Sequence, residues 1–133
     1  MGHLTRLKII EDEKQDLPKH ALVVMKDPNV GAAVTDLLHE IGFTPWAAVD
    51  SLSALLMCAE IDFELTLADI TLAGEMTAID LAVELRRRHE DMGFMFLADP
   101  ADEFPDGIHE FVVVRKPKRR TGTRYEPLWR RHH

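Results

Sequence analysis

The sequence contains a single cysteine, and it has no apolar run long enough to cross a lipid bilayer. One cysteine cannot form an intramolecular disulfide, which favours a reducing, cytoplasmic compartment. Cys58 lies within the apolar residues 55–61, so we expect a buried and unreactive thiol. The seven histidines show no spacing typical of a zinc site, and no glycine-rich phosphate loop or Ser-His-Asp grouping is present. From these absences we expect a protein that is not an enzyme and that has no membrane partner.

Positive charge is also scarce over most of the chain. The net charge of −7 divides unevenly: residues 1–114 hold 8 Lys and Arg against 22 Asp and Glu, whereas residues 115–133 hold 8 against 1. An acidic body argues against nucleic-acid binding over the whole surface. The basic end leaves a local nucleic-acid interface as an alternative.

Strand-like and helix-like segments alternate along the chain. Short apolar runs predict strands over residues 21–25, 44–49, 63–69, 92–97 and 111–114, and helical spacing predicts helices over residues 28–41, 52–60 and 79–89. Asp27 and Pro28 are typical of a helix start, Gly42 of a helix end, and Ser51 of a cap for the second helix. This order predicts an α/β domain with a flavodoxin-like, doubly wound, five-stranded parallel sheet of order 2-1-3-4-5.

Two helices of such a fold are expected to be reduced. Residues 99–110, between the fourth and fifth strands, contain Pro100, Pro105 and Gly107, which predicts a shortened or missing helix. The helix after the fifth strand is also expected to be short, because Gly122 interrupts it. We therefore divide the chain into an N-terminal arm (1–19), the domain (20–118) and a basic C-terminal segment (119–133).

In doubly wound sheets the site lies beyond the carboxyl ends of the strands, next to the point where the strand order reverses. Here that rule indicates residues 25–27 and Asp69. Residues 67–74, LADITLAG, and residues 114–117, VRKP, together resemble the receiver domains of response regulators in order, spacing and strand context. The resemblance implies that Asp69 occupies the phosphoacceptor position and that Lys116 is the lysine of the phosphate pocket.

Four positions depart from the receiver pattern. Where the family has an acid pair after the first strand, this chain has Met25 and Lys26, and the hydroxyl position after the fourth strand is Ala98. Val113 replaces the aromatic residue of the family's switch. Mg²⁺ requires oxygen ligands, so poor metal binding and no cofactor are expected. Asp27, with Asp69, is the weak alternative metal site, although a helix cap explains Asp27 as well.

Three functions follow. The leading interpretation is an atypical receiver of two-component-type signalling that acts as a protein-interaction module, with phosphorylation of Asp69 weak or absent. The second is a working phosphoacceptor in a histidine-kinase phosphorelay, with Mg²⁺ binding restored by Asp27. The third is a nucleic-acid-binding protein using the basic segment, which we disfavour. Expected partners are a histidine kinase or another signalling protein, or a second copy of the chain. We also hypothesise that the Lys26 ammonium pairs with Asp69, against the alternative that Lys116 alone does so.

Overall fold

The computed structural model describes residues 17–117, and the element bounds within it follow the alternation that the sequence predicts. The strands are β1 (Lys19–Val24), β2 (Phe43–Ala48), β3 (Leu65–Asp69), β4 (Gly93–Ala98) and β5 (Val112–Arg115), and the helices are α2 (Pro28–Glu40), α3 (Ser51–Glu60) and α4 (Ala78–Arg88). All neighbouring strands are parallel, in the order β2-β1-β3-β4-β5. The predicted doubly wound sheet is therefore confirmed.

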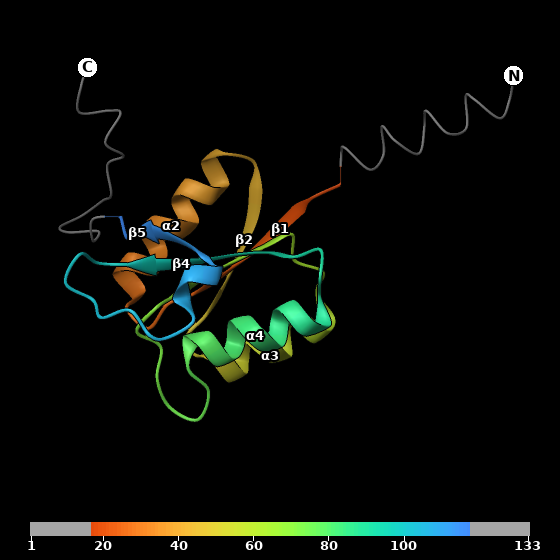
Figure 1. The fold of residues 1–133 in the computed structure, drawn as a ribbon. Coiled ribbons are helices and arrows are strands. Elements are labelled where there is room, and N and C mark those ends of the chain that lie inside the picture. Colours follow the sequence, from red (N-terminus) through yellow and green to blue (C-terminus); the bar gives the residue numbers. More distant parts are fainter. Residues whose placement is uncertain (1–16, 118–133) are drawn as a thin grey trace, which may run out of the picture.

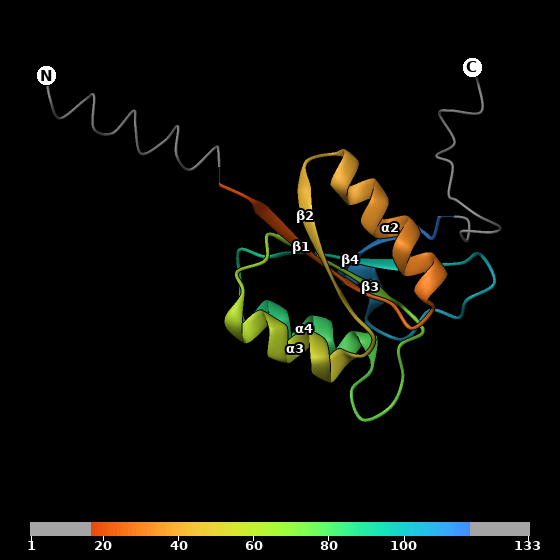
Figure 2. The same cartoon turned by 180° about the vertical axis from the view of Figure 1, so that it is seen from behind.

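The helices cover the sheet on both faces. Helix α2 lies on one face, and α3 and α4 lie side by side on the other (Figures 1 and 2). Alternate residues of each strand supply the two core layers, as the period of two requires. In β1, Leu22 and Val24 belong to the cluster under α3 and α4, whereas Ala21 and Val23 belong to the cluster under α2.

Local hydrogen bonds explain where the helices begin. Asp27 caps α2 by accepting a hydrogen bond from the backbone N–H of Asn29 at 2.9 Å, as the sequence predicts. The predicted cap of α3 is wrong by one residue. Asp50 has an extended backbone, and its carboxylate accepts from the N–H of Ser53 at 2.7 Å, whereas Ser51 is already helical. The extended backbone of Asp50 places it at the N-cap position, where Asp is as favourable as Ser.

The connection between β4 and β5 contains no full helix. Its only helical piece is a single 3₁₀ turn, Ile108–Glu110, preceded by Gly107 at φ 87°. The predicted loss of a helix here is confirmed, and its cause is the proline and glycine content of the segment. The short helix expected around residues 119–123 lies outside the described residues. In residues 17–117 no helix has the length and apolar content that crossing a membrane requires.

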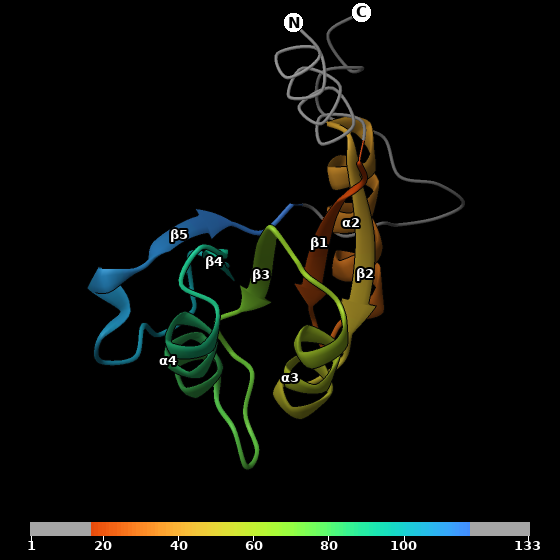
Figure 3. The ribbon, with the colours of Figure 1, turned by 90° about the vertical axis from the view of Figure 1, so that its right-hand side faces the viewer.

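The edge strands β2 and β5 lie at opposite sides of the sheet. Figure 3 shows β1 and β2 beside α2, with β5 at the opposite side of the sheet. Residue Asp69, which ends β3, pairs in register with Leu97 of β4, and Ala98 pairs with Arg115 of β5. Since parallel strands end at the same edge, this register brings the ends of β3, β4 and β5 together.

Candidate functional site

Asp69 and Lys116 meet at the carboxyl edge of the sheet, where the sequence placed them. The Nζ of Lys116 lies 3.0 Å from Oδ1 of Asp69, and both side chains are more than nine-tenths buried. The backbone N–H of Lys116 donates to the carbonyl of Ala98 at 2.9 Å, so the lysine continues the pairing of β5 with β4. The tertiary structure thus forms a buried ion pair from two residues 47 positions apart.

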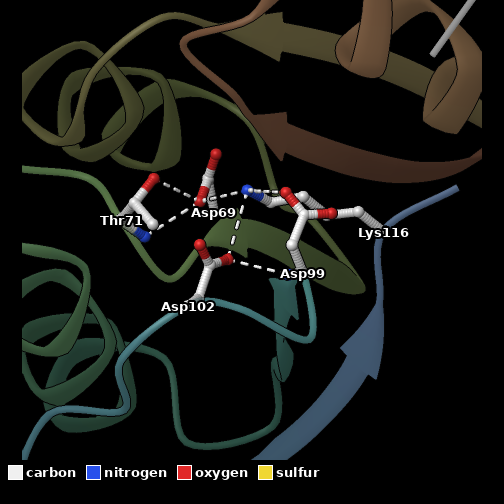
Figure 4. A network of polar contacts seen from close by, with 5 residues as sticks. All are labelled: Asp69, Thr71, Asp99, Asp102 and Lys116. Carbon is white, nitrogen blue, oxygen red and sulfur yellow. Dashed lines mark hydrogen bonds and ion pairs between the residues drawn. The ribbon is translucent and has the colours of Figure 1, made fainter. Parts of the chain in front are cut away.

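The interactions of Asp69 gather on one of its two carboxylate oxygens. Besides Lys116, Thr71 donates to Oδ1 from its backbone N–H at 2.9 Å and from its hydroxyl at 2.7 Å. In Figure 4 the second oxygen of Asp69 points away from these partners. Three donors on one oxygen hold the carboxylate in a fixed orientation.

Two further carboxylates surround Lys116, and sequence reasoning missed both. Oδ2 of Asp102 lies 3.5 Å and Oδ2 of Asp99 3.6 Å from the Nζ of Lys116 (Figure 4). The backbone N–H of Asp99 donates to Oδ2 of Asp102 at 2.7 Å, which closes the turn that follows β4. The available sequence signal was the position of Asp99, two residues after a predicted strand that ends at this edge. Lys116 therefore faces three carboxylates.

This acidic surrounding determines the protonation of the lysine. Burial acts to lower the pKa of Lys116, but the hydrogen bond and charge of Asp69 outweigh it, with help from the charges of Asp102 and Asp99. The pKa of Lys116 is consequently raised above its ordinary value of 10.5. The lysine is a permanent cation in this pocket at physiological pH.

The end of β1 offers no acid pair. Met25 is buried in the apolar cluster under α2, and its backbone N–H donates to the carbonyl of Ala48. Lys26 is exposed, and in the described part of the chain it makes no ion pair with Asp69. The ion pair that we hypothesised between them is thus wrong: Lys26 is turned to solvent, and the ammonium that pairs with Asp69 is that of Lys116.

The donor set does not fit a divalent cation of the usual receiver kind. A thioether in an apolar cluster and an exposed ammonium supply no oxygen ligand, and Asp27 is engaged as the cap of α2. Among residues 17–117, no group of three or more His, Cys, Asp or Glu side chains is arranged to hold a metal ion. The cation that Asp69 does contact is the ammonium of Lys116.

The other two positions that depart from the receiver pattern, Ala98 and Val113, lie on β4 and β5. Ala98 is buried and ends β4, so no hydroxyl is available at that point. Val113 packs partly buried against the cluster under α3 and α4. An aromatic residue near this position is Phe111, whose ring contacts that of Phe96 edge-on with a centroid distance of 5.3 Å. The guanidinium of Arg86 lies over the Phe111 ring, 4.1 Å from its centroid.

Comparison with known structures agrees with this fold. No family model matches the sequence, and no curated protein matches it. Among solved structures, the response regulator TrrA of Thermotoga maritima, in complex with Mg²⁺-BeF, matches with a TM-score of 0.66 at 24% identity, over 74% of this chain and 87% of that one. The BeF₃-activated SdrG of Pseudomonas melonis matches with a TM-score of 0.62 at 25% identity, over 74% and 84%.

A CheY-like receiver domain from Methylobacillus flagellatus matches with a TM-score of 0.65 at 18% identity, over 77% of this chain and 89% of that one. TrrA has also been solved in complex with the histidine kinase ThkA. These matches cover most of each compared domain. The chain has the fold of a response-regulator receiver domain.

Proposed function

We propose that this chain is an atypical receiver of two-component-type signalling. It acts as a cytoplasmic protein-interaction module and not as an enzyme, and phosphorylation at Asp69 is weak or absent. One observation carries the proposal: the buried Asp69 is neutralised by the ammonium of Lys116, while Met25 and Lys26 offer no carboxylate beside it.

The charge balance of the pocket supports this reading. Three carboxylates, those of Asp69, Asp99 and Asp102, face one ammonium. Phosphoryl transfer needs cations that neutralise the developing charge on the transferred group. Converting Asp69 to an acyl phosphate would bring more negative charge to a pocket that already holds an excess of it. Ala98, in addition, cannot donate a hydrogen bond to a phosphoryl oxygen.

A working phosphoacceptor is the second candidate. Asp69 lies within contact of Lys116, and within residues 17–117 no hydrogen bond reaches its Oδ2, so that oxygen could act as a nucleophile. Asp27 would have to exchange its role as helix cap for that of a Mg²⁺ ligand with Asp69. Under this reading the partner is a histidine kinase, as ThkA is for TrrA.

Acetyl phosphate with Mg²⁺ separates the two candidates. We expect intact-mass measurements to show little or no phosphate on the wild-type chain, because both the metal ligands and the hydroxyl are missing. The gain-of-function variant is Lys26→Asp combined with Ala98→Thr, which restores one carboxylate and the hydroxyl. It should gain phosphate that a further Asp69→Asn substitution removes. Stoichiometric phosphate on wild-type Asp69 would refute the proposal and establish the phosphoacceptor reading.

The partner is proposed on the same terms. A histidine kinase or another signalling protein is the expected partner, and association with a second copy of the chain is the alternative. The basic segment 119–133, on which the nucleic-acid alternative depends, lies outside the described residues. Filter binding to DNA and RNA at two salt concentrations tests that alternative, which requires tight and salt-sensitive retention.

A further inference from the structure

An apolar groove opens where β4 and β5 end. It has a volume of about 250 Å³ and is lined by the apolar residues Ala98, Pro100, Phe104, Val113 and Val114. The side chain of Phe104 is 55% exposed and so is accessible to a ligand in the groove. The groove exists because the β4–β5 connection forms a loop with one 3₁₀ turn, leaving the strand ends without a helix of ordinary length over them.

The groove is lined by one acidic and one basic residue, Asp99 and Arg115, and the loop beside it is acidic. The loop of residues 99–110 contains five Asp and Glu and no Lys or Arg. Asp99 and Asp102 are within ion-pair distance of Lys116, but Glu103, Asp106 and Glu110 are exposed, and in residues 17–117 none of the three makes a salt bridge. A ligand for this surface should therefore join an apolar or aromatic anchor to several positive charges.

The sequence that follows the last described residue, Pro117, combines aromatic residues with positive charge in this way. Residues 118–133 hold six Lys and Arg against one Glu, together with Tyr125, Leu128 and Trp129. The chain leaves the domain next to the groove, because Arg115 lines the groove and Pro117 is the last described residue. Trp129 is the twelfth residue after Pro117, a reach of at most about 43 Å.

We propose that the C-terminal segment of the same chain docks on this groove, with the indole of Trp129 against Phe104 and its arginines facing the acidic loop. Trp, Tyr and Arg are the residues that most often anchor interfaces. The short tether keeps the segment at high local concentration, which favours the same chain over a second copy. The docked segment would cover the surface beside Lys116 and block other basic partners from it. This inference goes beyond the proposed function and holds whether or not Asp69 is phosphorylated.

Fluorescence of Trp129 tests the proposal. The chain has two tryptophans, so the Trp46→Phe variant reports on Trp129 alone. In the full-length chain we expect blue-shifted emission and a quenching constant for acrylamide at least twofold below that of a free peptide of residues 118–133. Adding Phe104→Ser should abolish this protection. The matched control adds Leu56→Ser, at a 72% exposed leucine on α3 outside the groove, and should leave the protection unchanged.

Changes in salt and in protein concentration show whether the groove is filled by the C-terminal segment of the same chain or by that of a second copy. Raising the salt from about 0.1 M to about 1 M shortens the Debye length from roughly 10 Å to 3 Å and should weaken the protection. The protection should not change with protein concentration. Protection that disappears on dilution would assign the groove to a second copy and overturn the proposal. Protection that survives Phe104→Ser would also overturn it, because Trp129 would then be buried elsewhere.

A second measurement avoids any change at Trp46, which donates a hydrogen bond to His20. In the full-length chain, Trp129→Ala should shift the backbone amide signals of Ala101, Phe104 and Arg115. The signals of α3 residues around Leu56 should remain in place. Unchanged loop signals would refute docking on this groove even if the fluorescence variant failed to fold.

Discussion

Removing Lys116 and removing Asp69 should have unequal effects on stability. Lys116→Met leaves the carboxylate of Asp69 buried without its cation and with the carboxylates of Asp99 and Asp102 nearby. Asp69→Asn leaves the ammonium of Lys116 with those two carboxylates still at 3.6 and 3.5 Å. The lysine keeps partners in the second case, whereas the aspartate keeps only Thr71 in the first.

The two substitutions should therefore lower the free energy of unfolding by different amounts. Breaking a buried ion pair by removing one partner costs about 3–5 kcal/mol, which we expect for Lys116→Met. Asp69→Asn should cost about 1–2 kcal/mol, because the asparagine can still accept hydrogen bonds and Lys116 stays neutralised. Asp99 is more than half exposed, so solvent screens much of its attraction and Asp102 carries most of the compensation.

The assay is urea unfolding at neutral pH. The raised pKa of Lys116 means that the folded state holds this proton more tightly than the unfolded state. Its stabilising contribution is therefore complete below about pH 10.5 and is lost only as the pH rises through the folded-state pKa. The double variant, Lys116→Met with Asp69→Asn, should unfold at a higher urea concentration than Lys116→Met alone. It leaves no unpaired charge at position 69.

The control is Lys26→Met, which removes an exposed lysine that makes no ion pair with Asp69 and should change stability by less than about 0.5 kcal/mol. Equal losses for Lys116→Met and Asp69→Asn would show that Asp99 and Asp102 do not compensate the lysine. A loss at Lys26 equal to that at Lys116 would attribute the effect to the net charge of the protein.

Three further predictions concern α3 and its surroundings. Asp50→Ala should lower the urea midpoint, because it removes the cap of α3. The hydrogen bond from the Ser53 N–H lowers the pKa of Asp50. The stabilising contribution of Asp50 is therefore present at neutral pH and is lost as the pH falls below about 3.8. Ser51→Ala should be neutral or stabilising in the same assay, since the Ser51 hydroxyl is buried with no hydrogen-bond partner in the described part of the chain. Burial raises the pKa of Cys58 from 9.0 to about 11, so its reaction with a thiol reagent near neutral pH should be about a hundredfold slower than in urea-unfolded chain. Rapid labelling of the folded chain would contradict that burial.

The sequence by itself determined the architecture. Its alternating apolar runs and helical stripes are local patterns, and parallel strands joined by helices have few permitted topologies. It also determined that Asp69 and Lys116 share one edge, because Asp69 ends one strand and Lys116 closely follows another strand of the same parallel sheet. The loss of the β4–β5 helix was equally local, since Pro100, Pro105 and Gly107 act on the backbone next to them.

Only the tertiary structure decided which side chains meet at that edge. The convergence of Asp99 and Asp102 on Lys116 depends on the path of an irregular loop, which no periodicity encodes. The choice between Asp50 and Ser51 as the cap of α3 depended on where the chain leaves β2. Whether Lys26 pairs with Asp69 was also decided by the tertiary structure, in which Lys26 faces solvent and Lys116 alone of the two lysines reaches the carboxylate. Contacts of this kind are set by the packing of segments that are distant in the sequence. A local sequence pattern therefore does not show whether Lys26 contacts Asp69 in addition to Lys116.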